Sequence, residues 1–424
     1  MTSNDSSKLY RDIVCPFCSL LCDDLSIRNS SEKLSLERHG CPKAVKGFER
    51  NERKVRPAIH GESVELEVAL EHAASILKTS AQPLFAGCST DVEGSRELLA
   101  LAEKSGAIVD HAHGEGMMSN TLVLQSQGWI TTTLAELKNR ADLVIFIGTD
   151  AVTQYPRFFE RLIWDQASLA GLKRNARDIV YIGEDLNSKA GVSPKGKRPS
   201  VLKCPEKEIN ETVSVIHALY KGLEVQANVI PARRLSALKK IVERIKTAKY
   251  GVIVWDASEF SATDGDAIIQ SISSLIKEIN QQSRFAGLSL GGNNGGLSFI
   301  NVCAWQTGYP SRFNYNQGYP AYDPHANTTK KNLKNKSVDS LLWLSSFDNN
   351  LTAPRTEIPT IVISKPSRKY AKEAEVYIPI GTPGIDHSGN LIRTDSAVTL
   401  PLKKLRKLGL SSGSEILKKI RQMM

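Results

Sequence analysis

Short apolar runs alternate with helical patterns along most of the chain, and this alternation constrains the fold more than any other feature. The apolar runs predict eight strands, at Leu84–Gly87, Leu143–Gly148, Ile179–Gly183, Gly251–Asp256, Phe285–Leu290, Ser340–Leu344, Thr360–Ile363 and Glu375–Pro379. Apolar residues at helical intervals mark the stretches 66–79, 233–248 and 266–280 beside them. Such alternation favours parallel sheets with helices on both faces. The predicted fold class is α/β.

The length of 424 residues allows roughly two to four domains. We expect a small cysteine lobe at 1–57, an α/β domain at 58–140 and 285–424, and a Rossmann-like α/β domain inserted at 141–284. Gly, Pro, Asn and Lys accumulate at 187–199 and at 310–336. These two stretches are predicted to be long loops, and the second is long enough to indicate a functional or partner-ordered segment.

Four of the seven cysteines lie in the first tenth of the chain, with the spacing C-x2-C-x3-C-x18-C. They are Cys15, Cys18, Cys22 and Cys41. Four thiolates can each bind one iron of a [4Fe–4S] cubane, whereas structural zinc more often uses two separated C-x2-C pairs. A cluster is the first interpretation, buried thiols that bind nothing are the second, and zinc is the third. Lys43 would lie beside a cluster as a positive charge.

The net charge is +10, and the last 24 residues contain seven of the basic residues against one acid. The seven are Lys403, Lys404, Arg406, Lys407, Lys418, Lys419 and Arg421. The end of the chain also has the spacing of a small amphipathic helix. Because no nucleic-acid-binding motif accompanies this charge, we expect a surface for neighbouring subunits and no nucleic acid partner. No apolar run approaches the roughly 18 residues of a membrane helix and no signal peptide is recognised, so we expect a cytoplasmic protein without a membrane partner.

Three ordered segments resemble the B subunit of formylmethanofuran dehydrogenase, a member of the molybdopterin oxidoreductase superfamily. They are CPFCSLLCDD with GCPKA near the start, VCAWQTGYP at Val302–Pro310, and GIDHSGNLIRTDSAVTLPL from Gly384. The resemblance implies a molybdopterin oxidoreductase-like fold and a [4Fe–4S] cluster on the cysteine quartet. It also implies a cofactor-binding role for Lys43, between the cluster and a pterin.

Two segments depart from the pattern of an active family member. The family binds tungsten or molybdenum through two pterins and the cysteine of a Cys-His-Gly motif, which here reads Ala112-His113-Gly114, and a methyl group cannot ligate a metal. An Arg-Gly-His of the family is replaced by GGN at 291–293, so a guanidinium and an imidazole are missing. We predict no catalytic residues, no molybdopterin or tungsten, and a vestigial pocket of Ala112, His113, Gly114, Gly291 and Asn293.

Histidines near the vestigial motif offer another kind of site. Asp110, His111, His113 and Glu115 contain the H-x-H pattern of amidohydrolase zinc sites. Such sites need further His and Asp ligands at later strand ends, and only three histidines follow, one of them inside a helical pattern. A residual pocket wall is therefore the favoured interpretation.

The resemblance is most specific to the redox-inactive B subunit of the bacterial formyltransferase/hydrolase complex. That complex implies an amidohydrolase-like A subunit, a β-helical C subunit and a formyltransferase D subunit, which act in tetrahydromethanopterin-dependent oxidation of formaldehyde to formate. The chain would be a structural component of this enzyme complex, without redox activity of its own. Its subunit contact is predicted at Trp305, Tyr309, Tyr315, Tyr319 and Tyr322. The alternative is the catalytic subunit of an active formylmethanofuran dehydrogenase.

Overall fold

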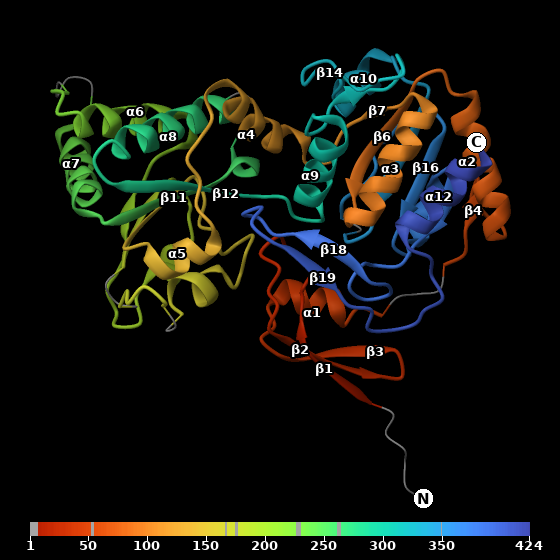
Figure 1. The fold of residues 1–424 in the computed structure, drawn as a ribbon, viewed down its shortest axis with the longest axis horizontal. Helices are drawn as coiled ribbons and strands as arrows, with labels where there is room; N and C mark the ends of the chain where they lie inside the picture. The colour runs from red at the N-terminus through yellow and green to blue at the C-terminus, as the bar shows by residue number, and fades with distance from the viewer. Residues whose placement is uncertain are drawn as a thin grey trace, which may run out of the picture. The chain divides into compact units, whose positions relative to one another are not determined.

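The computed structural model describes residues 7–51, 55–165, 168–173, 177–225, 230–260, 264–348 and 350–424. The chain forms two compact units: residues up to Gly114 together with Gly292–Met424 make the first, and Glu115–Gly291 make the second (Figure 1). The sequence places the inserted domain at 141–284. The second unit extends further at both ends, because α4 (Gly114–Gln127) and α5 (Leu134–Arg140) precede its first strand and β12 (Arg284–Leu290) completes its sheet.

The cysteine lobe of the first unit is a small antiparallel sheet with one helix. Its elements are β1 (Lys8–Ile13), β2 (Leu25–Ser30), β3 (Lys33–Arg38) and α1 (Pro42–Phe48). Ser31 and Glu32 join β2 to β3 with positive φ angles of 51° and 68°, as a two-residue hairpin turn requires. The longer connection between β1 and β2 carries three of the four cysteines.

A nine-stranded sheet forms the centre of the first unit. Its order is β14 (Ala321–Tyr322), β13 (Phe313–Asn314), β7 (Ile108–Val109), β6 (Pro83–Ser89), β15 (Ser340–Ser345), β16 (Thr360–Ser364), β17 (Val376–Pro379), β4 (Ala58–Ile59) and β5 (Glu62–Ser63). The five central strands, from β7 to β17, are parallel, and the short strands at both edges are antiparallel. The strands predicted within this sheet are confirmed.

Both faces of this sheet are buried, as the parallel arrangement requires. Alternate residues of β6 show it, because Phe85 joins one apolar core while Leu84 and Ala86 join another. The first core includes α2 (Leu66–Thr79), α3 (Val92–Ser105), α9 (Gly296–Thr307) and α12 (Gly413–Met423), and the second is covered by α10 (Thr329–Asn335) and α11 (Arg368–Glu373). A separate hairpin pairs β18 (Gly389–Ile392) with β19 (Thr399–Leu402).

The second unit is a five-stranded parallel sheet with the order β10-β9-β8-β11-β12. Its other elements are β8 (Leu143–Ile147), β9 (Asp178–Ile182), β10 (Ser200–Leu202), β11 (Tyr250–Asp256), α6 (Glu206–Tyr220), α7 (Ala232–Thr247) and α8 (Gly265–Ile279), with single turns η1 (Phe159–Ile163), η3 (Ser188–Gly191) and η4 (Ala257–Glu259). One face packs Ile145 and Ile253 against α6, α7 and α8, and the other stacks Phe146 on Tyr181 with ring centroids 5.0 Å apart. The α/β class with helices over parallel sheets is confirmed.

The stretch 310–336 is not the long irregular loop that its composition predicts. It contains β13, β14 and α10. Gly, Pro and Asn occupy the turns between these short elements, whereas Phe313 is fully buried and pairs with Val109 of β7. The segment therefore forms one edge of the central sheet, and apolar periodicity missed it because each element is too short to show a repeat.

The basic C-terminal segment folds onto its own chain. Ser412 and Glu415 form a capping box at the start of α12, and Ile416, Leu417 and Ile420 are fully buried, so the predicted amphipathic helix is confirmed. Lys419 and Arg421 pair with Glu67 and Glu97, each at 2.9 Å, and Arg406 pairs with Asp386 at 2.7 Å. The basic segment was expected to be a surface for neighbouring subunits, and this expectation is wrong for Arg406, whose side chain is only 5% exposed.

Arg406 and Asp386 are the buried ion pair of this segment, with side chains 5% and 2% exposed. We expect Arg406→Ala to reduce the free energy of unfolding by about 3–5 kcal/mol, because it leaves the Asp386 carboxylate buried without its cation. Lys404→Ala removes an exposed positive charge two residues away. This variant should change the free energy of unfolding by less than about 0.5 kcal/mol. Urea-induced unfolding of both variants measures the difference, and equal midpoints would contradict the assignment.

Candidate functional site

The structure brings the four N-terminal cysteines to one place in the lobe. Cys15, Cys18 and Cys22 are 4–6% exposed, and the loop closes through a hydrogen bond of 2.8 Å from the Cys15 N–H to the Cys22 carbonyl. Cys41 directly precedes α1, where its Sγ accepts from the Ala44 N–H at 3.5 Å. The buried loop and the start of the helix thus supply the four thiols that the spacing singles out.

The four thiols influence one another electrostatically. Burial, and then the charge of Cys18, raises the pKa of Cys15 well above its ordinary value. Burial and then Cys22 raise the pKa of Cys18 to about 12, against a smaller opposing effect of Lys43. The site therefore disfavours thiolates by themselves and suits a positively charged group that would take up their charge. Lys43 lies near enough for its positive charge to lower the pKa of Cys18 slightly.

A zinc ion and an iron–sulfur cluster require different distances between the cysteine sulfurs. One zinc ion binds thiolates at about 2.3 Å in a tetrahedron, which places the sulfurs about 3.8 Å apart. Within the described part of the chain, no three of the four Sγ atoms lie within 4.8 Å of one another. A cubane binds each thiolate to a different iron and has no need of such close sulfurs.

Ser19, inside the cysteine loop, joins the lobe to two distant segments. Its N–H donates to Asn293 Oδ1 at 2.8 Å, and its carbonyl accepts from the Thr394 N–H at 2.8 Å. The Ile392 N–H in turn donates to Ser298 Oγ at 2.9 Å, so the last segment is also tied to α9. The cysteine loop, the GGN stretch and the closing segment therefore meet, although more than 270 residues separate the first from the second.

The residues that follow Asn293 pack closely against the end of β6, whereas a Cβ added at Gly291 would meet nothing within 4 Å. Gly295 has a φ of 76°, and a Cβ on it would lie 2.0 Å from the carbonyl oxygen of Thr90. Ser89 Oγ also donates to the Asn294 carbonyl at 2.7 Å. Asn293, predicted as part of a vestigial pocket, thus has a structural task, because its side chain holds the cysteine loop.

The Ala112-His113-Gly114 motif connects β7 to α4. The Ala112 N–H donates to the Gly87 carbonyl at 3.3 Å, and the Ala112 side chain packs against the apolar core that contains Leu84 and Trp343. A Cβ at Gly114 would lie 2.7 Å from Asp110 Oδ1, so the turn needs glycine there. Position 112 therefore directs a methyl group at an apolar core.

His111 is a buried, neutral imidazole in this turn. It is 2% exposed, its ring stacks on Phe299 with centroids 5.6 Å apart, and its Nδ1 accepts from the His113 N–H at 3.0 Å. The proton therefore lies on Nε2, which has no hydrogen-bond partner among the described residues. Burial, and then the neighbouring His113, lowers the pKa of His111 to about 3.

The zinc site considered from the H-x-H pattern does not form. Within the described residues, Asp110, His111, His113 and Glu115 contribute no group of three ligand atoms that lie within 4.8 Å of one another. Asp110 instead binds Arg312, at 3.2 Å between Oδ1 and Nε, and accepts from the N–H and Oγ1 of Thr329 at 2.7 and 2.8 Å. This buried pair joins the turn after β7 to the segment that precedes β13. Arg312 was not identified from the sequence, because 202 residues separate it from its partner and no local pattern marks it.

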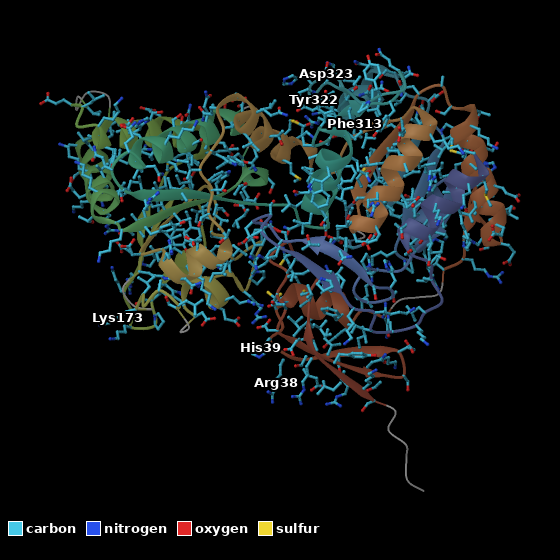
Figure 2. The ribbon with its side chains drawn as sticks, in the orientation of Figure 1. Arg38, His39, Lys173, Phe313, Tyr322 and Asp323 are labelled. Carbon is cyan, nitrogen blue, oxygen red and sulfur yellow. The ribbon has the colours of Figure 1, made fainter. Side chains whose placement is uncertain are left out.

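The aromatic residues predicted as a subunit contact fall into two groups. Trp305 and Tyr319 are 64% and 58% exposed, and the rings of Tyr309 and Tyr322 stack with centroids 4.9 Å apart. Tyr322 is labelled in Figure 2. Tyr315 is only 6% exposed and packs in the apolar core, so its assignment to a surface is wrong. The other four aromatic side chains are at least partly exposed, as a subunit contact requires.

The low pKa of His111 predicts a pH dependence of stability. Between about pH 3 and 6.5 the unfolded chain binds a proton that the folded chain does not, so the free energy of unfolding falls as the pH falls. The loss is about 2 kcal/mol between pH 7 and pH 5. His111→Gln, whose amide oxygen can still accept from His113, should lack this loss.

Urea-induced unfolding of both proteins at pH 7 and pH 5 gives the comparison. Asp91, whose pKa is raised to about 6 chiefly by burial, acts with the opposite sign in both proteins, so the difference between them isolates His111. Parallel pH profiles would contradict a neutral buried imidazole.

No helix in the described residues is long and apolar enough to cross a membrane. No protein-family model matches the chain. The chain is 26% identical over 414 residues to the B subunit of tungsten-containing formylmethanofuran dehydrogenase 2 of Methanocaldococcus jannaschii, which covers 94% of both chains. It is 27% identical over 339 residues to the B subunit of the formyltransferase/hydrolase complex Fhc of Methylorubrum extorquens, which covers 78% of this chain and 87% of the relative.

Two solved structures share the fold. The crystal structure of the formyltransferase/hydrolase complex FhcABCD from Methylorubrum extorquens, in complex with methylofuran, matches with a TM-score of 0.73 and 24% identity over 86% of this chain and 98% of that one. Acetylene hydratase from Pelobacter acetylenicus matches with a TM-score of 0.66 and 11% identity over 98% of this chain and 69% of that one. The resemblance carried by three sequence segments is confirmed: the chain is a homologue of the B subunits of formylmethanofuran dehydrogenase and of the Fhc complex.

Proposed function

We propose that this chain is the B subunit of a formyltransferase/hydrolase complex and that it supports the complex without a redox reaction of its own. Support comes from the similarity to the Fhc B subunit and from the fold shared with a chain of FhcABCD. In this proposal the complex oxidises formaldehyde to formate in tetrahydromethanopterin-dependent one-carbon metabolism. Formyl transfer and hydrolysis take place on an amidohydrolase-like A subunit and a formyltransferase D subunit, and a β-helical C subunit completes the assembly.

Ala112 is the observation that carries this proposal. The family resemblance implies a metal-binding cysteine at this position, and here a methyl group packs against the apolar cluster that contains Leu84 and Trp343. The imidazole next to it, His111, is buried and neutral, and its Nδ1 is engaged by the backbone of the same turn. These residues do not fit a tungsten or molybdenum pterin, because they offer no anionic ligand at the position of the missing cysteine.

We also propose that Cys15, Cys18, Cys22 and Cys41 bind a [4Fe–4S] cluster. The burial of Cys15, Cys18 and Cys22, the raised pKa values of Cys15 and Cys18, and the separation of the sulfurs support it. A bound cluster would supply four covalent links between the loop and the start of α1. Ser19 would hold the loop against the α/β domain, and Lys43 would offset part of the negative charge.

We also propose a cytoplasmic location. All seven cysteines are free, which is consistent with a reducing compartment.

The second candidate is the catalytic subunit of an active formylmethanofuran dehydrogenase. The complete cysteine quartet with Lys43 favours it, as does the similarity to relatives described as tungsten-containing. Metal content distinguishes the two candidates, because only the active enzyme requires tungsten or molybdenum.

We expect anaerobically purified complex to contain about four irons per copy of this chain and no stoichiometric tungsten or molybdenum. Cys18→Ser should lose the iron, because it removes one of the four ligands. Elemental analysis combined with the visible absorption of the cluster measures both.

Cys204→Ser is the matched control, since Cys204 lies in the second unit and its Sγ pairs with Thr212 Oγ1, a contact that a hydroxyl can keep. Stoichiometric tungsten or molybdenum would overturn the redox-silent assignment, and zinc in place of iron would overturn the cluster.

The exposed aromatic residues give a test of the architectural role. We expect Trp305→Glu combined with Tyr319→Glu to reduce co-purification of the other subunits by roughly tenfold or more, because large exposed aromatic side chains dominate interface energetics. Leu169→Glu is the control, since Leu169 is 93% exposed and lies in the second unit. Quantitative pull-down of the complex measures the loss. If the other subunits still assemble and act unchanged when this chain is deleted, the architectural role fails.

A further inference from the structure

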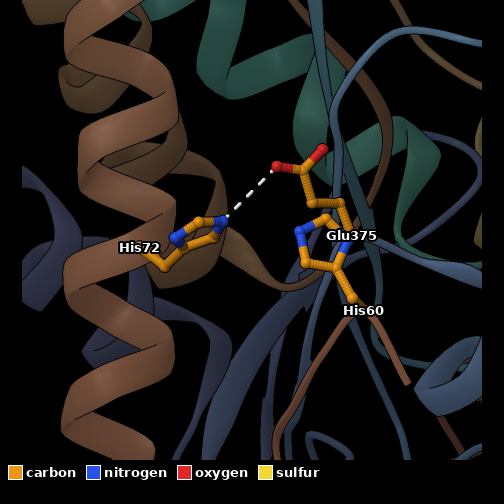
Figure 3. A group of neighbouring side chains, drawn as sticks. All are labelled: His60, His72 and Glu375. Carbon is orange, nitrogen blue, oxygen red and sulfur yellow. Dashed lines mark hydrogen bonds and ion pairs between the residues drawn. The ribbon is translucent and has the colours of Figure 1, made fainter. Parts of the chain in front are cut away.

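His60, His72 and Glu375 converge at the β17–β4–β5 edge of the nine-stranded sheet (Figure 3). Each offers one ligand atom, and the three atoms all lie within 4.8 Å of one another. His60 comes from the turn between β4 and β5, His72 from α2, and Glu375 from the residue before β17. Within the described residues, no other three His, Cys, Asp or Glu side chains come so close.

The separation of His72 from Glu375 matches two ligands of one metal ion. Their closest atoms, Nε2 and Oε1, are 3.4 Å apart. This is longer than the 2.7–3.2 Å of an ordinary N–H to oxygen hydrogen bond. Two atoms that each lie about 2.0–2.1 Å from a tetrahedral zinc are about 3.4 Å apart. The pair is thus a long hydrogen bond whose length also equals the spacing of two ligands on one zinc ion.

The backbone holds the three side chains in place without a metal. The His60 N–H donates to the Glu375 carbonyl at 2.9 Å, and β4 continues this register, with Ile59 opposite Val376. His72 lies on the helix whose neighbouring residues Leu70 and Ala73 are fully buried. The backbone at each of the three residues is already in place, so little conformational entropy is lost when an ion binds.

His60 occupies a turn position that fixes its direction. Ile59 pairs with Glu62, and the two residues between them, His60 and Gly61, have φ angles of 47° and 84°. A two-residue turn with both φ angles positive prefers Asn or Gly, and a side chain there is held on one side of the hairpin. The imidazole is consequently presented toward Glu375, with a ring centroid 6.1 Å from that of His72.

The charges and exposure suit a divalent cation. No Lys or Arg in the described part of the chain pairs with the Glu375 carboxylate. The side chains of His72 and Glu375 are 37% and 24% exposed and His60 is exposed, so an ion could enter from solvent and keep a water ligand. Two imidazoles and one carboxylate select zinc or another late first-row metal over magnesium or calcium.

We propose that His60, His72 and Glu375 form a zinc-binding site with three protein ligands and water in the fourth position. The ion would join the β4–β5 hairpin to α2 and to the start of β17. The site is separate from the cysteine quartet and does not depend on the function proposed above.

The zinc content of chelator-treated, untagged full-length chain after incubation with Zn²⁺ and gel filtration tests this proposal. We expect wild type to retain about one more zinc per chain than His60→Asn, because Asn keeps the turn and removes the ligand. His72→Gln should show the same loss. His325→Asn, which removes an exposed histidine elsewhere, should retain the wild-type content.

Cobalt distinguishes this site from the cysteines. Co²⁺ bound by imidazole and carboxylate gives visible d–d absorption without the intense thiolate-to-metal charge-transfer bands. We expect wild type to show the d–d absorption of Co²⁺ bound by imidazole and carboxylate, and we expect His60→Asn to lack it. Equal zinc content and equal cobalt spectra in wild type, His60→Asn and His72→Gln would overturn the site.

Discussion

The position of the cysteine loop depends on the two hydrogen bonds at Ser19. Its N–H and its carbonyl are bound by Asn293 and Thr394, which come from the turn after β12 and from the closing segment of the chain. Val14 and Leu21 of the same loop also pack in one apolar cluster with Phe347, Leu391 and Leu402. This packing and the two hydrogen bonds together determine how the loop faces the α/β domain. Any group bound by the four thiols would lie where these segments meet.

The turn after β7 is stabilised by apolar packing and by a buried ion pair. Ala112 contributes a methyl group to an apolar cluster, and Asp110 and Arg312 form a buried ion pair beneath the turn. Such a pair is strongly destabilised when one partner is removed, so the turn keeps its shape for reasons of stability. The turn that holds His113 and Gly114 carries an alanine at position 112. Its conformation is supported by packing, and no reaction is needed to explain it.

The fold was largely predictable from local patterns. The predicted strands and amphipathic helices are present, because burial of both faces of a parallel sheet leaves apolar runs that the sequence shows directly. The edge segment at 310–336 was missed, since its two-residue strands carry no periodicity. The basic tail was misjudged for Arg406, whose charge gives no sign that Asp386 lies beside it in the core.

The sequence by itself determined the fold class, the set of four thiols, the relationship to the B subunit of formylmethanofuran dehydrogenase and the absence of a cysteine at position 112. These are properties of residue type, spacing and order, which can be recognised without the folded structure. The tertiary structure alone decided which distant residues meet: Ser19 with Asn293, Asp110 with Arg312, and His60 with His72 and Glu375. Each of these contacts joins segments that lie next to one another only after the sheet has assembled, so no local pattern in the chain could mark them.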